Sequence, residues 1–350
     1  MVPTNRPVQS LTACMELARE TDIPLIVVCS KLVQYGQVID VASDAGVKAY
    51  ALDLGTQLGN SLWPFATTAD DELATASSVT TRDLSPKRNL GLVLARMLGW
   101  ERLMFLDDDI YGISREDVDA LAAGLSDHSV SVLIPQEFPD NSVVCHAHRL
   151  GGGEQGRFAS AGGMGVRCDR ADLAFFPNIY NEDWFFFSGE AASRRIIEVG
   201  ESRQRKYDPY ADRERAVKEE FGDLLAEGLY ARLDHKQGLR GVDAAYWTAF
   251  IEQRKAFHAR VTESLRRHDQ RNGDTQTGRD VRAAEISIGA AREKLDEISP
   301  ELCHKFITLW RADLAEWRRY LAELEHFESI GSALERLKLD YGESADPNTR

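Results

Sequence analysis

The stretch SPKRNLGLVLARMLGWERLMFLDDD, residues 85–109, decides the fold that this sequence predicts. Its apolar residues recur at three- and four-residue steps over 87–98, which indicates an amphipathic helix. Gly99 follows, in the position where a left-handed C-cap costs least. The run RLMFL, residues 102–106, then predicts a short buried strand. The stretch is therefore typical of a helix–strand unit, and it ends in three consecutive aspartates.

Strands and helices alternate on both sides of this unit. Apolar runs at 23–29 and 47–54 precede it and predict two further strands. Ser114 follows it as the N-cap of another helix, and 130–134 is the next predicted strand. Alternation of this kind favours an α/β fold with a parallel sheet that helices cover on both faces.

The C-terminal part of the chain is almost wholly helical in pattern. One helix is predicted over 211–232, and Ser299 with Pro300 predicts the start of another. Its apolar stripe consists of Leu302, Phe306, Leu309, Trp310, Leu314, Trp317, Leu321 and Leu324. The stripe fits a helical bundle within the chain or a dimer seam, and its width favours the bundle. We expect two parts, residues 1–205 and a helical region over 206–345.

Three segments have the composition of loops. The glycine-rich stretch 151–165 is expected to rim a site, although a plain solvent loop has the same composition. The polar stretch 269–278 predicts a turn between two helices. Residues 342–350 are expected to fray.

The composition limits the partners. The chain has 350 residues, with 42 basic and 56 acidic side chains and a formal net charge of −14. That charge repels polyphosphate backbones, so we expect no nucleic-acid partner. No apolar run reaches the roughly 18 residues of a membrane span, and the N-terminus does not have the pattern of a signal peptide. The five cysteines are scattered without a CxxC pair, which favours free thiols in a reducing cytoplasm.

The triplet Asp107–Asp109 is the strongest candidate for a functional site. Three adjacent carboxylates repel one another, so a cation or several hydrogen-bond donors must neutralise them. Ligands of open parallel sheets bind at the carboxyl ends of the strands, which is where the triplet is expected to lie. Oxygen ligands without clustered cysteine or histidine favour Mg²⁺ or Mn²⁺. The alternative is an acidic turn before the helix that begins near Ser114.

Two neighbouring motifs extend this candidate site. Lys87 and Arg88 open the helix before the acidic strand, where positive side chains and free N–H groups bind anions, unless water solvates them. Glu182 and Asp183 precede a run of aromatic residues. Partial desolvation raises the proton affinity of such a carboxylate towards that of a general base. The same segment could equally begin a helix, with Asn181 or Asp183 as its N-cap.

The histidines give weaker signals. His146 and His148 alternate along 143–150, which is expected to be a strand. A pair of this kind could hold a metal, but pairing with neighbouring polar groups is favoured. His235 lies just beyond the predicted helix 211–232 and is a further candidate for a metal ligand.

Three segments together resemble the family 2 glycosyltransferases, which have the GT-A fold. They are residues 85–109, the block GGMGVRCDRADLAFFPNIYNEDWFFF at 162–187, and VPTNRP at 2–7. The resemblance covers roughly residues 2–200, and the order and spacing of the three segments carry it. It implies a Rossmann-like, mixed but mainly parallel sheet flanked by helices, with a helical C-terminal extension.

The resemblance also implies roles for individual residues. Asp183 would be the base that deprotonates the acceptor hydroxyl, with Glu182 beside it. Mg²⁺ or Mn²⁺ would be held by Asp107 and Asp109, with His235 as a late ligand of the kind that some related enzymes supply. The residues expected to bind the nucleotide sugar are Pro3, Thr4, Arg6, Asp53, Lys87, Arg88, Asn89, Asp107 and Asp108. Asp53 is included because Cys29-Ser30-Lys31 stands where the family often has an acidic residue.

These features predict a metal-dependent transfer of a sugar from a nucleoside-diphosphate sugar to a hydroxyl acceptor, with inversion if Asp183 is the base. A nucleotidyltransferase or a nucleotide-sugar mutase would use the same triplet and cations without an acceptor base. A nucleotide-sugar-binding protein or helical scaffold without catalytic activity is the third alternative. A homo-oligomer formed through the C-terminal helices is also possible on the sequence.

Overall fold

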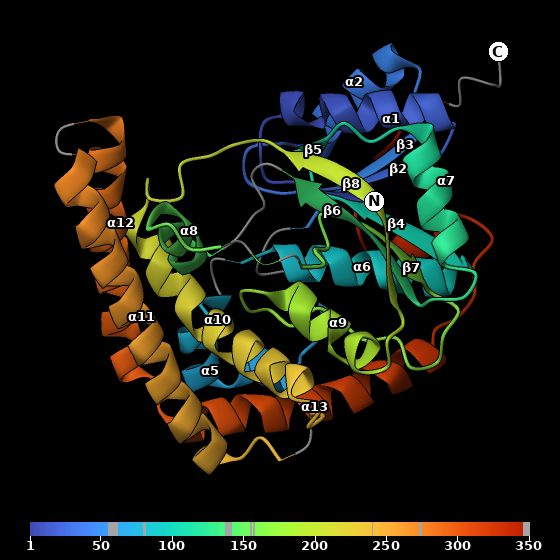
Figure 1. Ribbon diagram of the computed structural model, residues 1–350. Helices are drawn as coiled ribbons and strands as arrows, with labels where there is room; N and C mark the ends of the chain where they lie inside the picture. The colour runs from blue at the N-terminus through green and yellow to red at the C-terminus, as the bar shows by residue number, and fades with distance from the viewer. Residues whose placement is uncertain are drawn as a thin grey trace.

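The computed structural model describes residues 1–54, 62–79, 82–136, 142–154, 156, 158–239, 241–272 and 275–345. Their strands form two sheets with helices around them (Figure 1). The first sheet has the order β1 (Val2–Pro3), β2 (Leu25–Cys29), β3 (Ala49–Asp53), β9 (Tyr341–Glu343). The second has the order β4 (Arg102–Leu106), β7 (Gly163–Arg167), β6 (Val130–Gln136), β8 (Ile196–Gln204), β5 (Ile110–Tyr111).

The strand directions correct one expectation. β1, β2 and β3 are parallel, as are β6 and β8. The other pairs are antiparallel, so four of the seven strand pairs among the described residues run in opposite directions. An α/β fold with mixed sheets is confirmed, whereas a mainly parallel sheet is wrong. Apolar composition does not encode strand direction, because a buried strand satisfies its hydrogen bonds with either kind of neighbour.

The chain start joins the two sheets. The ammonium group of Met1 donates to the carbonyl of Met104 at 2.7 Å, and Leu106 N donates to the carbonyl of Met1 at 3.0 Å. β1 therefore lies beside β4. The residues that follow these two strands, Thr4 and the aspartate triplet, come out at the same edge.

Helices flank both sheets, as expected. In Figure 1 α1 and α2 lie together beyond one face, and α6 lies on the opposite side of the strands. The helices of the N-terminal part are η1 (Val8–Leu11), α1 (Thr12–Thr21), α2 (Tyr35–Ala45), α4 (Ala66–Ala69), α5 (Asp71–Ala76), α6 (Leu84–Met97), α7 (Arg115–Gly124), α8 (Val143–Leu150) and α9 (Glu182–Ala192). Those of the C-terminal part are α10 (Arg213–Asp234), α11 (Ala244–Asn272), α12 (Gln276–Glu297), α13 (Pro300–Ala322) and α14 (Ile330–Arg336).

Helix α6 is buried along almost its whole length. It begins three residues before the predicted start at 87, and Gly99 follows it with a φ of +67°, in the left-handed conformation expected there. The charged residues of its first turns, Lys87 and Arg88, are enclosed along with its apolar residues. This enclosure fixes where their charges lie.

Residues 143–150 form helix α8, so the predicted strand is wrong. Ser142 Oγ accepts a hydrogen bond from Cys145 N and caps the helix. Val143 and Ala147, four residues apart, share one core cluster with residues of α11 and α12. Helical spacing therefore buries these apolar side chains, whereas alternation along a strand would put them on opposite faces.

The C-terminal helices pack onto the rest of the chain. Ser299 caps α13 with Pro300 at its first position, as predicted. Most of the apolar stripe of α13, including Trp310 and Trp317, is buried in the cluster that also holds Phe105 of β4. Packing within the chain is thus confirmed for the stripe, and the two predicted ranges share one core. The turn predicted over 269–278 is confirmed only at its centre: residues 269–272 are the end of α11, residues 276–278 are the start of α12, and residues 273–274 lie outside the described residues.

The end of the chain contradicts the expected fraying as far as residue 345. Tyr341–Glu343 form strand β9 on the edge of the first sheet, and the Ser344 hydroxyl accepts a hydrogen bond from Ala49 N at 2.7 Å. Residues 346–350 lie outside the described residues. None of the helices described is both long and apolar enough to cross a lipid bilayer.

Candidate active site

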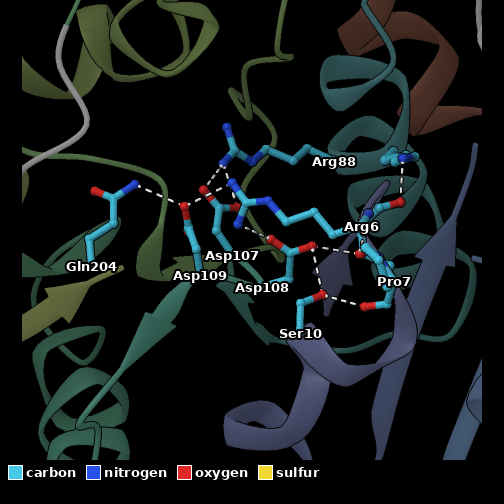
Figure 2. A network of polar contacts seen from close by, with 10 residues as sticks. Arg6, Pro7, Ser10, Arg88, Asp107, Asp108, Asp109 and Gln204 are labelled. Atoms are coloured by element: carbon cyan, nitrogen blue, oxygen red, sulfur yellow. Dashed lines mark hydrogen bonds and ion pairs between the residues drawn. The ribbon is translucent and has the colours of Figure 1, made fainter. Parts of the chain in front are cut away.

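The ends of β1 and β4 bring the N-terminal residues onto the acidic triplet, Asp107–Asp109. Thr4 Oγ1 donates to Asp108 Oδ2 at 2.6 Å. Arg6 donates from Nη1 to Asp108 Oδ1 at 2.8 Å and from Nη2 to Asp109 Oδ2 at 3.0 Å. Figure 2 shows the Arg6 guanidinium lying across the triplet, with Gln204 approaching Asp109 from the far side. Residues expected to meet the nucleotide therefore contact the aspartates directly.

Arg88 neutralises the remaining aspartate. Its Nη2 donates to both oxygens of Asp107, at 2.8 and 2.9 Å, and its Nη1 pairs with Glu182. Burial lowers the pKa of Arg88, but Asp107 and Glu182 outweigh burial and raise it above the ordinary value. Gln204 Nε2 also donates to Asp109 Oδ2, at 3.2 Å. Several donors therefore relieve the repulsion among the three aspartates, which is one of the two ways that the sequence allowed.

Two adjoining cavities open beside this network. One of about 270 Å³ is lined by Arg88, Asp107, Glu182 and Asp183, among others. The other, of about 150 Å³, is lined by Pro3, Thr4, Asn5, Arg6, Asp83, Leu84, Lys87, Asp107, Asp108 and Asp109. Asp107 lines both, so the two cavities meet at the tip of β4. Ser160 and Gly162 of the glycine-rich stretch line the larger one, which agrees with the expected rim.

The acid pair Glu182–Asp183 begins helix α9 on the opposite wall. Asn181 is the residue before the helix, with a φ of +60°. Asp183 accepts hydrogen bonds from Ala161 N at 3.1 Å and from Trp184 N at 2.9 Å. Burial raises the pKa of Asp183, and burial with the neighbouring Asp183 charge raises the pKa of Glu182 to about 7, against the opposing effect of Arg88. Both predicted functions of this segment, a helix start and a pair of acids with high proton affinity, coincide here.

Lys87 points inward and holds the strand ends together. Its Nζ donates to the Thr4 carbonyl at 2.8 Å, to Ser30 Oγ at 2.7 Å and to Asp83 Oδ2 at 3.3 Å. Burial lowers the pKa of Lys87, while the Asp83 carboxylate opposes that effect. The ammonium group therefore lies beneath the smaller cavity, where it links β1, β2 and α6.

Three predicted residues lie apart from the cavities. Asn89 donates to the Phe176 carbonyl at 2.9 Å and accepts from Phe176 N at 2.8 Å, so both of its polar atoms hold the loop before α9. Asp53 ends β3 and lines neither cavity; burial raises its pKa. His235 is exposed just after α10, whose 22 residues span roughly 33 Å.

The histidine pair of helix α8 also differs from its prediction. His146 Nε2 is 3.0 Å from the Tyr207 hydroxyl, and the His148 ring lies 5.2 Å from the Phe257 ring. Polar pairing, the favoured alternative, is therefore confirmed for His146. The two rings do not alternate along a strand, because residues 143–150 are helical.

Sequence reasoning missed Asp83 and Gln204. Asp83 lines both cavities. Its carboxylate accepts a hydrogen bond from Ser30 Oγ at 2.5 Å and forms an ion pair with Lys87, one helical turn further along the chain. Its spacing of four residues from Lys87 was a usable signal. Gln204 reaches the triplet because β8 pairs with β5, opposite Ile110. That pairing links residues far apart in the chain and has no local signature.

Asp107 of the triplet has carboxylate oxygens that remain open to a further ligand. Asp107 is 27% exposed, and both of its oxygens face one nitrogen of Arg88, so each keeps a lone pair. Mg²⁺ is commonly held by one or two carboxylates, with substrate phosphates and water completing its shell. Asp107 and Asp109 could supply these ligands. In the part of the chain that the structure describes, no group of three or more His, Cys, Asp or Glu side chains is placed to hold a metal ion.

The sequence comparisons with known proteins found no match, so the function of the site is inferred from its geometry. No protein-family model matches this chain, and no curated protein matches it in sequence.

Proposed function

We propose that this chain is a glycosyltransferase that moves a sugar from a nucleoside-diphosphate sugar to a hydroxyl acceptor, on a GT-A type of α/β fold. One observation carries the proposal. The Glu182–Asp183 pair and Asp107 line the 270 Å³ cavity, and the whole Asp107–Asp109 triplet lines the adjoining 150 Å³ cavity. Arg88 forms ion pairs with both Asp107 and Glu182. The resemblance of residues 85–109 and 162–187 to family 2 glycosyltransferases supports the same assignment.

The donor binds beside the triplet in this proposal. Arg6, which is 45% exposed, can turn from the aspartates towards a diphosphate, and Arg88 holds Asp107 in place. Mg²⁺ or Mn²⁺ on Asp107 and Asp109 would neutralise the diphosphate as a Lewis acid. Asp53 and His235 line neither cavity, so we assign them no contact with the donor. Asn89 positions the loop that carries the acid pair.

The acceptor binds beside Asp183. The anomeric carbon–oxygen bond to the diphosphate breaks, and its electron pair leaves with the phosphate oxygen. The acceptor hydroxyl forms the new bond to the anomeric carbon and gives its proton to the Asp183 carboxylate. Asp183 suits this role because two backbone N–H groups fix its orientation, while Glu182 is ion-paired with Arg88. Attack from the side opposite to the diphosphate inverts the anomeric centre.

The proposal also includes the cellular compartment of the protein and its oligomeric state. All five cysteines are free thiols, four of them buried, which suits a reducing cytoplasm. In this proposal the C-terminal helices shape the acceptor side of the site. A homo-oligomer would form through the same helices. No partner of nucleic-acid type is proposed, because the net charge is −14.

The test is acceptor-dependent release of free nucleoside diphosphate. A panel of nucleotide sugars is first screened by thermal shift with and without Mn²⁺, because a ligand that binds the native state raises its apparent stability. The best donor is then incubated with hydroxyl acceptors, and nucleoside diphosphate is quantified. Release that requires an acceptor supports the proposal. Pyrophosphate exchange would instead indicate a nucleotidyltransferase, and ring isomerisation without release a mutase.

A further inference from the structure

A third cavity, of about 520 Å³, lies between α9 and α10 next to the acid pair. It is lined by Phe158, Ala159, Trp184, Phe187, Ile196, Glu227, Tyr230, Ala231, Asp234 and Phe250. Ala159 and Trp184 are the chain neighbours of Ser160 and Asp183, which line the 270 Å³ cavity. The two cavities therefore share two walls, and the third lies where an acceptor would extend away from Asp183.

Aromatic side chains make up half of its lining, five of the ten residues. The Trp184 and Tyr230 rings are 4.6 Å apart between centroids, and those of Phe158 and Trp184 are 6.2 Å apart. The Tyr230 hydroxyl donates to the Trp184 carbonyl at 3.1 Å, which ties α10 to α9. Ring faces carry partial negative charge, so they attract cations and the apolar C–H face of a sugar ring.

Two carboxylates, Glu227 and Asp234, are the charged groups of the lining. No basic side chain joins them there among the residues that the structure describes. Glu227 Oε2 pairs with Arg254 Nη1 at 2.5 Å, and its side chain is still 29% exposed. Asp234 is exposed at the end of α10. The cavity therefore presents negative charge to whatever enters it.

Glu227 belongs to a larger group of carboxylates around one arginine. Arg254, which is fully buried, also holds Glu220 at 2.8 Å and Asp223 at 2.9 Å. One guanidinium therefore faces three carboxylates. His258 contributes no positive charge, since burial and the Arg254 charge lower its pKa to about 3. Burial raises the pKa of Glu220 to about 7 and also raises the pKa of Glu227, against the opposing Arg254 charge, so proton binding relieves part of this excess.

We propose that this cavity binds the acceptor and selects an amino sugar, whose ammonium group lies against the aromatic rings and contacts Glu227 and Asp234. A hydroxyl of the same ring then faces Asp183. The inference rests on the proposed function for the role of Asp183. It goes further by naming the acceptor class, and it excludes acceptors with phosphate or carboxylate groups in the cavity.

The experiment compares three probes that differ at one position: methyl β-D-glucosaminide, its N-acetyl derivative and methyl β-D-glucoside. Binding is measured by titration calorimetry and by saturation-transfer NMR on the purified full chain, without donor. We expect the glucosaminide to bind about tenfold more tightly than the other two, as cation–π and carboxylate contacts add roughly 1–2 kcal/mol. The preference should disappear above the pKa of the amine.

Variants locate the preference. E227Q and D234N should each weaken glucosaminide binding severalfold and leave glucoside binding unchanged. E214Q, the same change at an exposed position early on α10, is the matched control. Because Glu227 also pairs with Arg254, D234N keeps the test valid if E227Q does not fold. Equal affinity of the three probes, or a preference that survives both variants, overturns the inference.

The two proposals fail in different ways. Donor-dependent transfer to uncharged acceptors, without amine selectivity, would retain the glycosyltransferase and overturn the amino-sugar site. Amine-selective binding that depends on Glu227 and Asp234, with no nucleoside diphosphate released from any donor, would retain the site and contradict the transferase.

Discussion

Two arginine-centred networks in this molecule differ in how far they are exposed to water. At the end of β4, Arg6 and Arg88 face Asp107–Asp109, and the Arg6 side chain is 45% exposed. Between α10 and α11, Arg254 faces Glu220, Asp223 and Glu227 and is fully buried. An exposed arginine can exchange its carboxylates for a ligand, whereas a buried one cannot leave without stranding charge.

Asn181 connects the buried Arg254 network to the segment that carries the Glu182–Asp183 pair. Asp223, held by Arg254, accepts a hydrogen bond from Asn181 Nδ2 at 2.7 Å. Asn181 has the left-handed conformation that turns the chain into α9, immediately before Glu182 and Asp183. The helical region therefore contributes to the candidate site by fixing the start of α9. Most of the charged side chains of that region lie away from the two cavities at the triplet.

The largest effect is expected for Arg254→Met. The change leaves the buried Glu220 and Asp223 and the partly buried Glu227 without their cation, and we expect a loss of about 3–5 kcal/mol in the free energy of unfolding. Urea unfolding followed by circular dichroism measures it. Lys255→Met is the matched control, since Lys255 forms a more exposed pair with Asp296 and should cost less than about 1 kcal/mol. Equal losses in the two variants would mean that the buried network does not stabilise the fold.

Asp183→Asn should act on the rate and spare donor binding. Removing a general base lowers the rate of sugar transfer by roughly 10²–10⁴-fold, while the thermal shift caused by the donor should stay as in the unmodified protein. The matched control is Glu190→Gln, an acid on the same helix that pairs with Arg195 away from the cavities. A near-normal transfer rate in Asp183→Asn would remove Asp183 from the chemistry.

The pH dependence of transfer should follow the acid pair. Burial and the adjacent charge raise the pKa of Glu182 to about 7, and burial raises the pKa of Asp183. As the pH falls through about 7 the pair binds a proton, less base remains, and kcat/KM should decline. Glu182→Gln removes the neighbouring negative charge, so the decline should move to lower pH. A pH–rate profile that does not move would contradict the assigned pairing.

The smallest effect on stability is expected for Arg6→Gln. Arg6 is 45% exposed, and Thr4 and Gln204 still donate to the buried Asp108 and Asp109 in its absence, so the free energy of unfolding should change much less than in Arg254→Met. Donor binding, measured by the thermal shift of the best nucleotide sugar, should nevertheless weaken, because Arg6 lies over the triplet. A stability loss as large as that of Arg254→Met would erase the contrast between the two networks.

Local sequence was sufficient for the elements that carry the candidate site. The spacing of apolar residues predicted α6 to within three residues of its start, and the run 102–106 predicted β4. The same reasoning placed acids at the tip of β4 and at the start of α9. It misassigned 143–150 as a strand because two histidines alternate there, although apolar residues four apart already indicated the helix.

By itself, the sequence determined where several helices and strands begin, α6, β4 and α13 among them, and which side chains bear charge, because turns of helix, caps and buried runs depend on neighbours within a few residues. Only the tertiary structure decided that β7 runs antiparallel to β4, that residues 341–343 join β3, and that Gln204 reaches Asp109. It also decided that arginines neutralise the triplet. These facts depend on contacts between residues about 20 to 290 positions apart, and no local pattern encodes such contacts.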